Sequence, residues 1–267
     1  MKIAYCIPSI YHPSGIERVV LLKANYFADV FGYDMYIITT DGKDKKTHYP
    51  VSPKVKQIHL DINFEELYRR PFIKRALGYY WRQRIHKKRL KKVLSEIKPD
   101  ITISVLFREV KIINSIKDGS RKIGEFHFNK NAYPDPEMPD NPPFTKKVFN
   151  ILMKRLLDYQ VKKLDRFVVL TGQDSMKWSH LVDQITVIPN PLSFLPDQVS
   201  DFRSHKVIAV GRYCNQKGYD MLIKAWKLVS ETHPDWLLQI FGGGEKNDCN
   251  RRGRSWKDTR SLPRGFR

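Results

Sequence analysis

The chain has 267 residues, of which 41% are hydrophobic and 12% aromatic, a composition that suits a globular protein and excludes an intrinsically disordered one. Its length allows one large α/β domain or two small ones. Lys and Arg number 48 against 28 Asp and Glu, so the formal net charge is +20 and we expect an anionic partner. Charge alone does not choose among a phosphorylated substrate, nucleic acid and a membrane surface.

The three cysteines, Cys6, Cys214 and Cys249, are widely spaced and form no Cys-x-x-Cys pair. A disulfide framework or zinc site is therefore not expected, and a reducing cytosol is the default compartment. The first apolar run is broken at Pro8, unlike a signal peptide, and no run of 18 apolar residues occurs anywhere. We expect a cytoplasmic protein that meets a membrane, if at all, peripherally on its cytoplasmic face.

Short apolar runs alternate with amphipathic stretches in chain order. The pattern predicts strands at residues 2–7, 33–40, 55–60, 99–106, 121–126, 166–171 and 184–189. It predicts helices at residues 15–31, 64–97, 108–116, 146–164 and 173–181, and a proline-rich loop at 133–143. Such alternation is typical of an α/β fold with a doubly wound, Rossmann-like parallel sheet covered on both faces.

A second, shorter unit follows a polar segment. We predict a first domain at residues 1–189, a linker at 190–205 and a partial second α/β domain at 206–245. The second unit comprises a strand at 206–210, a helix at 217–232 and a strand at 236–241. Residues 246–267 form a basic tail of atypical composition, which we expect to be disordered.

Two candidate site residues follow strands of the first domain, where ligands of open parallel sheets bind. Gly15 begins a helix within "PSIYHPSGIER", and its backbone could approach a ligand at the positive end of that helix. An ordinary strand–helix connection explains it equally well, and the missing GxGxxG pattern argues against a nicotinamide or flavin site. His127 follows a strand directly; a lone histidine is more often structural, but its position at a strand's carboxyl end favours function.

The third candidate site is "VIAVGRYCNQKGYDMLIKAW", residues 207–226, in the second unit. Arg212 offers a planar fork for phosphate, Lys217 adds a point charge, and the following helix adds its dipole. Two cations on one loop suit a diphosphate leaving group as its negative charge develops. The alternative is a solvated surface loop.

These stretches together resemble the retaining, GT-B type glycosyltransferases called family 4 or group 1. The segment "VGRYCNQKGYDMLIKAW" is similar to that family's V-G-R…K-G…L-I-x-A-W/F pattern. The segments "PSGIERV", "EFHFN", "VVLTGQDSMKW", "VIPNP" and "QIFGGGE" support the likeness, which covers about residues 1–245 in the same order.

The resemblance implies a nucleotide-sugar donor held between two Rossmann-like domains. By this likeness Arg212 and Lys217 would bind the donor diphosphate, and His127 would line the reacting centre as the catalytic-site residue. Gly15 would approach donor or acceptor, and Gly242, Gly243 and Gly244 would pass close to the nucleotide. The resemblance implies no cofactor and no metal, because the cations neutralise the diphosphate. It also implies a glycan or lipid-linked acceptor and a role in surface polysaccharide or glycolipid synthesis.

One departure from the family is a missing E-x7-E type motif, which nothing after Glu245 matches. In the family this motif contacts the transferred sugar and the nucleotide ribose. The sequence therefore predicts a chain truncated in its donor domain, with little or no transferase activity. A natural short form, or a tail that binds anions, is the alternative.

The stretch from Arg69 to Lys92 holds eleven Lys or Arg, interleaved with aromatic and apolar residues, and no acid. It is typical of a helix on anionic lipid head groups; nucleic-acid binding and a solvated helix face are the alternatives. The candidate membrane contacts are Arg82, Arg84, Lys87 and Lys88. For the whole chain, the alternative to a glycosyltransferase is a non-catalytic basic protein that binds nucleic acid or an anionic membrane.

Overall fold

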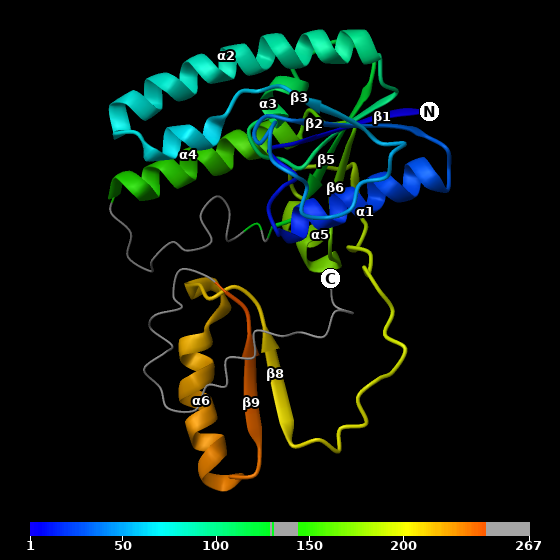
Figure 1. Ribbon diagram of the computed structural model, residues 1–267. Helices are drawn as coiled ribbons and strands as arrows, with labels where there is room; N and C mark the ends of the chain where they lie inside the picture. Colours follow the sequence, from blue (N-terminus) through cyan, green and yellow to red (C-terminus); the bar gives the residue numbers. More distant parts are fainter. Residues whose placement is uncertain (129, 131–143, 244–267) are drawn as a thin grey trace. The chain divides into compact units, whose positions relative to one another are not determined.

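The computed structural model describes residues 1–128, 130 and 144–243, which divide into two compact units, one up to Phe194 and one from Leu195 onward. The first unit contains a seven-stranded sheet, whose strand order is β3-β2-β1-β4-β5-β6-β7 (Figure 1). The strands are β1 (Lys2–Ile7), β2 (Asp34–Thr39), β3 (Lys56–His59), β4 (Ile101–Ser104), β5 (Arg121–Phe126), β6 (Arg166–Val169) and β7 (Ile185–Val187). Every neighbouring pair is parallel, which confirms the predicted doubly wound sheet.

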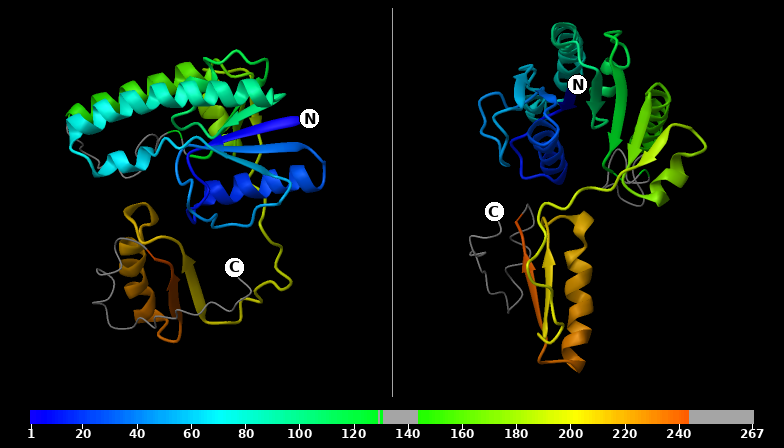
Figure 2. Two further views of the ribbon diagram at one scale, coloured as in Figure 1. Left: turned by 45° about the horizontal axis from the view of Figure 1, so that its top comes forward. Right: turned by 90° about the vertical axis from the view of Figure 1, so that its right-hand side faces the viewer.

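Helices cover both faces of this sheet because alternate residues of each strand point to opposite faces. On one face, Ile3, Tyr5 and Ile7 of β1 pack in a cluster with the buried side of α1 (Gly15–Asp29). On the other face, Ala4 and Cys6 of β1 share a cluster with buried residues of α2 (Phe72–Ile97), α3 (Val110–Ile113), α4 (Phe144–Val161) and α5 (Gly172–Trp178). Figure 2 shows α1 and α2 on opposite sides of the strands.

The direction of winding reverses between β1 and β4. β1 pairs with β2 on one side, at Ile3↔Met35, and with β4 on the other, at Ile3↔Ile101. In an open parallel sheet such a reversal leaves a crevice beyond the carboxyl ends of the two central strands. The loops after β1 and β4 are therefore where a ligand of this unit is expected.

The long predicted helix at 64–97 is wrong at its beginning. The chain instead forms a 3-10 helix, η1 (Phe64–Arg69), then extended backbone at Arg70, and only then α2. Pro71 is the cause, because a residue that precedes proline is driven out of the α region by clash with the proline ring. The predicted helix at 108–116 is also shorter in the structure, at Val110–Ile113.

The second unit contains β8 (Lys206–Val210), a 3-10 turn η3 (Asn215–Lys217), α6 (Tyr219–Thr232) and β9 (Leu237–Phe241). β8 and β9 pair in parallel with Lys206↔Leu237. The predicted helix start at residue 217 is wrong: Gly218 adopts a left-handed conformation with φ of 62°, so η3 ends at Lys217 and α6 begins after it. This glycine permits a turn that a residue with a side chain would resist.

Candidate functional site

The loop after β1 leads into α1 and leaves the start of that helix open. The Ser14 side chain caps α1 by accepting a hydrogen bond from the backbone N–H of Glu17, at 3.2 Å. Gly15 is exposed, and a Cβ built on it would meet no heavy atom within 4 Å. Packing within the described chain therefore does not require a glycine here. The open space lies at the positive end of a helix, where an anionic or polar group is favoured.

Glu17 is buried in the first turn of the same helix. Ser9 donates a hydrogen bond to its Oε1 at 2.7 Å, whereas its Oε2 is buried without a hydrogen-bond partner among the described residues. Burial raises the pKa of the Glu17 carboxyl above its ordinary value, although the Ser9 hydrogen bond opposes the shift. Sequence reasoning missed this residue, since a first-turn glutamate commonly serves only the helix dipole.

His127 belongs to a buried polar cluster formed by β1, α1 and the end of β5. Its side chain is 2% exposed, and its Nε2 lies 3.2 Å from Oε2 of Glu125. Glu125 also accepts hydrogen bonds from the Tyr5 hydroxyl at 2.9 Å and from Lys23 Nζ at 2.8 Å. Burial alone would raise the pKa of Glu125, but the hydrogen bonds and charges of His127 and Lys23 outweigh it and lower that pKa.

This cluster fixes the imidazole ring. With Nε2 directed at the Glu125 carboxylate, Nδ1 of His127 is the free ring nitrogen, buried and without a hydrogen-bond partner in the described part of the chain. A fixed ring with one uncommitted nitrogen can donate or accept a single hydrogen bond at a defined point. The structural and functional roles left open by the sequence are thus compatible in one residue.

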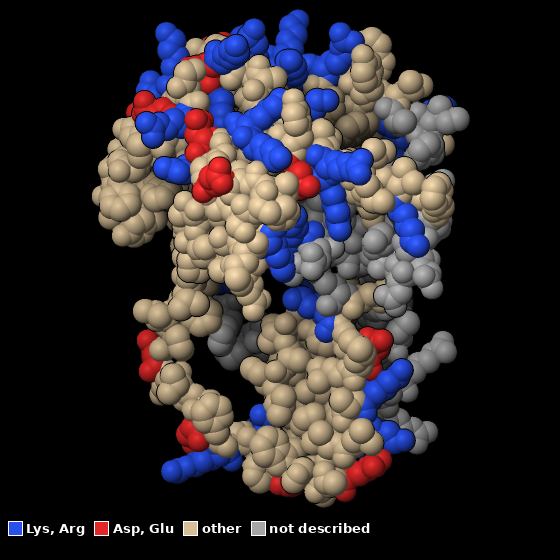
Figure 3. Space-filling view, turned by 180° about the vertical axis from the view of Figure 1, so that it is seen from behind, with Lys and Arg blue, Asp and Glu red and all other residues tan. Residues whose placement is uncertain are grey.

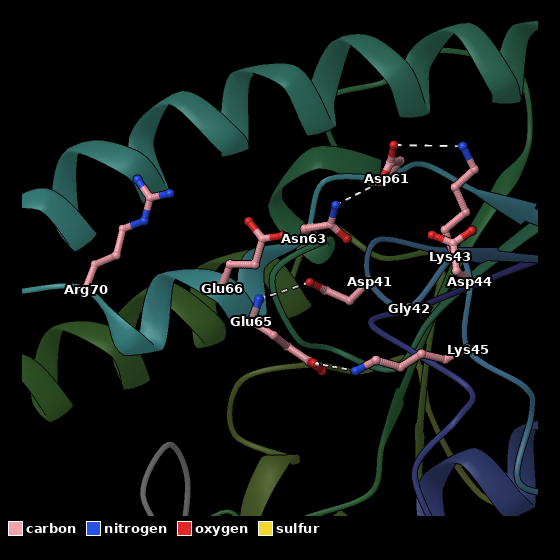
Figure 4. A pocket seen from close by; sticks show the side chains of 10 residues that line it. All are labelled: Asp41, Gly42, Lys43, Asp44, Lys45, Asp61, Asn63, Glu65, Glu66 and Arg70. Atoms are coloured by element: carbon pink, nitrogen blue, oxygen red, sulfur yellow. Dashed lines mark hydrogen bonds and ion pairs between the residues drawn. The ribbon is translucent and has the colours of Figure 1, made fainter.

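A pocket of about 610 Å³ lies beyond the carboxyl ends of β2 and β3 (Figure 4). Both carboxylates and cations line it, and most come from the loops that follow these two strands and from η1. The lining residues are Asp41, Gly42, Lys43, Asp44, Lys45, Asp61, Asn63, Glu65, Glu66 and Arg70. Sequence reasoning did not single out this pocket, although the charged run "DGKDKK" directly after a buried strand was its signal.

Tyr11 connects the loop after β1 to this pocket. Its hydroxyl donates a short hydrogen bond to Glu65, and Lys45 Nζ lies 3.9 Å from the centre of its ring. Burial and the Glu65 hydrogen bond raise the pKa of the Tyr11 hydroxyl well above its ordinary value. His12 Nε2 lies 3.1 Å from the other Glu65 oxygen. An aromatic ring beside charged groups that bind hydroxyls is a surface suited to a sugar.

Asp41 and Arg108 link the pocket to the crevice between β1 and β4. Arg108, from the loop after β4, places Nη1 3.4 Å from Asp41 Oδ2, and the Asp41 side chain is 2% exposed. Thr40 and the backbone N–H of Glu65 also donate to the Asp41 carboxylate, at 2.6 and 3.0 Å. These three partners hold the Asp41 carboxylate in place between the pocket and the loop after β4. The carboxylates of Asp44, Asp61 and Glu66, in contrast, remain in contact with solvent.

In the second unit the parallel ladder continues past the strand ends. The backbone N–H of Gly211 donates to the carbonyl of Phe241, and that of Tyr213 to the carbonyl of Gly243, each at 2.9 Å. Arg212 is held between these two bonds and is exposed, as is Lys217. We call residues 211–218 the donor loop. It presents both predicted cations to solvent on a hydrogen-bonded backbone.

Glycine is required where the donor loop meets the end of β9. A Cβ built on Gly242 would lie 1.9 Å from the carbonyl oxygen of Gly211, so only a residue without a side chain allows this approach. Gly243, in contrast, has nothing within 4 Å of such a Cβ, and the space beside it is open. Gly244 lies outside the described residues. The predicted loop of glycines thus divides into one position set by internal packing and one facing open space.

The four candidate membrane contacts lie on α2 but differ in environment. Arg82 donates to Glu66 at 2.7 Å and its side chain is only 18% exposed. Arg84, Lys87 and Lys88 are exposed, and Arg84 donates to the Tyr80 hydroxyl at 2.8 Å. The structure therefore separates Arg82, which ties α2 to η1, from three cations that face solvent.

Two other kinds of feature are absent from the described residues. No group of three or more His, Cys, Asp or Glu gathers there as metal ligands would. Within the same part of the chain, none of the helices combines the length and apolar character that crossing a membrane requires.

A doubly wound first unit, followed by a second α/β unit with cations and glycines at its strand ends, is similar to the GT-B fold of glycosyltransferases. Comparison with known proteins agrees with this likeness. Residues 197–252 match the family described as glycosyl transferases group 1. This segment of the chain is therefore similar to the group 1 glycosyltransferases, the family that the sequence motifs resemble.

An uncharacterized glycosyltransferase of Haemophilus influenzae is 27% identical over 257 residues, a match that covers 92% of this chain and 63% of the relative. The chain thus spans less than two thirds of that relative's length. Solved structures agree in fold. Staphylococcus aureus TarM matches with a TM-score of 0.65 and 12% identity, over 93% of this chain and 73% of TarM. Sucrose-phosphate synthase of Thermosynechococcus elongatus matches with a TM-score of 0.67 and 15% identity, over 94% of this chain and 64% of the synthase.

Proposed function

We propose that this protein transfers a sugar from a nucleotide-diphosphate sugar to a glycan or lipid-linked acceptor, with retention of configuration. It would need neither a bound metal nor a cofactor, and it would serve surface polysaccharide or glycolipid synthesis. The observation that carries this proposal is the donor loop. Its exposed cations, Arg212 and Lys217, lie within the segment that matches the group 1 glycosyltransferases.

The donor loop suits a leaving diphosphate. Transfer of the sugar leaves negative charge on the diphosphate, and donors already in position stabilise that charge most. Arg212 can give two parallel hydrogen bonds to phosphate oxygens, and Lys217 can approach as a point charge. A TarM structure contains UDP and alpha-GlcNAc-glycerol, and an E. coli structure described as trehalose-6-phosphate contains UDP-2-fluoro glucose. A uridine nucleotide is therefore the first donor to test.

The first unit would bind the acceptor and help to place the transferred sugar. The pocket beyond β2 and β3 offers carboxylates that accept hydrogen bonds from hydroxyls, and the Tyr11 ring lies beside it. His127, fixed by Glu125, would offer Nδ1 to a hydroxyl of the transferred sugar. Gly15 leaves room at the start of α1 for a polar group of either substrate.

We also propose a cytoplasmic location with peripheral contact to the membrane. Arg84, Lys87 and Lys88 on α2 would face anionic head groups, because they are exposed on a helix with neighbouring exposed aromatic residues. Arg82 is left out of this contact, since its guanidinium is engaged by Glu66.

Calorimetric titration with UDP, GDP and UMP tests the donor assignment. We expect the purified chain to bind a nucleoside diphosphate more tightly than the monophosphate. Arg212→Ala or Lys217→Ala should weaken diphosphate binding roughly ten- to a hundred-fold each, the value of a charge-assisted hydrogen bond, with little effect on UMP. Lys227→Ala, an exposed cation on α6, is the matched control and should bind like the parent.

Two results would contradict the proposal. One is equal binding of diphosphate and monophosphate by parent and variants. The other is tight binding of oligonucleotides together with no measurable binding of any nucleoside diphosphate, which would favour the alternative of a non-catalytic basic protein. Donor hydrolysis and transfer assays with radiolabelled sugar nucleotides then measure the activity itself, and they decide between transfer and the little or no activity that the missing E-x7-E motif predicts.

A further inference from the structure

Helix α4 has one face packed on the sheet and an apolar face turned to solvent. At 100° per residue, its buried residues Asn150, Leu157 and Val161 lie on one side of the helix. The opposite side carries large apolar residues, which we call the α4 apolar face. Its members and exposed fractions are Phe144 at 79%, Val148 at 38%, Ile151 at 51%, Leu152 at 58%, Leu156 at 40% and Tyr159 at 56%.

Six exposed apolar side chains on five successive turns are unlike the usual outer face of a helix on a globular protein, which is polar. Apolar patches of this kind mark places where a protein contacts another body. The position of these residues opposite a well-packed side shows that the sheet does not need them. Their apolar character therefore serves something outside this unit.

Cations rather than acids accompany the α4 apolar face. Lys147, Arg155, Lys162 and Lys163 are exposed on or beside it, and Lys163 Nζ lies 4.0 Å from the centre of the Tyr159 ring. The one acid of α4, Asp158, is only partly exposed. An apolar stripe flanked mainly by cations is typical of helices that lie in the plane of an anionic membrane surface.

Helix α2 adds a second cationic surface on the same side of the sheet. Buried residues of both helices, among them Leu90 of α2 and Leu157 of α4, belong to one core cluster. The outer side of α2 exposes Trp81 at 62% and Tyr80 at 56%, beside Lys and Arg residues. Figure 3 shows Lys and Arg gathered at the top of the molecule, where α2 runs in Figure 1.

We propose that the α4 apolar face inserts into the head-group region of an anionic lipid bilayer, with the cations of α4 and α2 held at its phosphates. Charge complementarity favours this partner, because the lysines and arginines can pair with lipid phosphates while the apolar side chains enter the apolar part of the bilayer. Exposed Trp and Tyr are favoured where an apolar phase meets water. This proposal rests on the peripheral membrane contact proposed above and extends it from the α2 cations to the α4 apolar face, and it is independent of nucleotide binding at the donor loop.

Sedimentation with vesicles tests the apolar part. The probes are vesicles of phosphatidylcholine and phosphatidylglycerol in equal parts, and of phosphatidylcholine alone. The triple variant Ile151→Ser, Leu152→Ser and Leu156→Ser should bind the anionic vesicles roughly ten-fold less well or worse, at low and high salt alike. Tyr26→Ser with Val30→Ser removes exposed apolar residues at 53% and 59% from the α1 side and should bind like the parent.

The cationic part has a different signature. Replacement of Lys147, Arg155 and Lys162 by Gln should weaken binding to anionic vesicles roughly five-fold per charge at low salt, and much less at high salt. Lys87→Gln with Lys88→Gln should act in the same direction through α2. UDP titration of each variant should match the parent, which separates this surface from the donor loop.

Insertion, as opposed to surface attraction, has its own readout. A tryptophan placed by Phe144→Trp should be quenched by lipids brominated on their acyl chains beyond the quenching of the parent. Three results would overturn the proposal: no added quenching, equal sedimentation of the triple serine variant and the parent, or a dimer without vesicles that this variant dissociates. Binding of an oligonucleotide that competes fully with anionic vesicles and is unchanged in the serine variant would also overturn it.

Discussion

Replacing Gly242 by alanine should open the junction between the donor loop and β9. The new methyl carbon would lie 1.9 Å from the Gly211 carbonyl oxygen, whereas real Cβ atoms essentially never approach another heavy atom closer than 3.0 Å. The two segments must therefore part by about 1 Å. The hydrogen bonds from Gly211 to Phe241 and from Tyr213 to Gly243, both 2.9 Å, would then exceed bonding distance.

The cost follows from these contacts. Two hydrogen bonds at about 1 kcal/mol each, with 1–3 kcal/mol for forced packing, give roughly 3–5 kcal/mol. Hydrogen exchange measures it locally: because a factor of ten corresponds to about 1.4 kcal/mol, the amides of Gly211 and Tyr213 should exchange at least about a hundred-fold faster. Gly243→Ala is the matched control, since its Cβ meets nothing within 4 Å.

The reasoning is refuted if the two alanine variants show the same exchange at these two amides. It is refuted equally if Gly242→Ala exchanges like the parent, because the loop would then tolerate a side chain that the geometry excludes.

Two further predictions concern the first unit. His86 is 1% exposed, and its burial together with the charge of Arg108 lowers its pKa to about 4. As the pH is lowered, the unfolded chain therefore takes up a proton at this residue before the folded chain does. The free energy of unfolding should fall as the pH drops from 6.5 to 4, by up to about 1.4 kcal/mol per pH unit. Urea titrations should show that His86→Phe flattens this slope and that the exposed His180→Gln does not; equal slopes in parent and His86→Phe would contradict the assignment. Glu125→Gln removes the charge that Lys23 meets at 2.8 Å in a nearly buried pair and should lower the free energy of unfolding by about 3 kcal/mol. The exposed Glu96→Gln should change it by less than about 0.5 kcal/mol, and equal effects of the two glutamate variants would disprove a structural role for the cluster.

The order of strands and helices could be predicted from the sequence because apolar runs and amphipathic periods are local signals. Residues 2–7, 121–126 and 206–210 form strands with the predicted bounds. Element ends were less predictable, since one residue decides them. Pro71 ends the extended connection before α2, and the left-handed Gly218 separates Lys217 from α6. Both residues were visible in the sequence, but their effect depended on backbone geometry.

The candidate sites also differ in how far the sequence could predict them. Arg212 and Lys217 could be recognised because both lie on one short loop, where sequence distance sets spatial distance. The Glu125 cluster could not, because Tyr5, Lys23 and Glu125 come from three elements that only the sheet order brings together. The pocket beyond β2 and β3 likewise depends on the return of η1 to the loop after β2, through the hydrogen bond from Glu65 to Asp41.

The paired strands of the second unit have a consequence for handling the protein. In the described residues β8 and β9 pair only with each other, and Ile208 and Val210 are exposed at 64% and 70% on alternate positions of β8. Free backbone edges beside apolar side chains recruit further strands. The outer strands of the large sheet, β3 and β7, are only four and three residues long. Aggregation of concentrated samples should therefore begin at the edges of β8 and β9, and added Lys at residue 208 or 210 should suppress it.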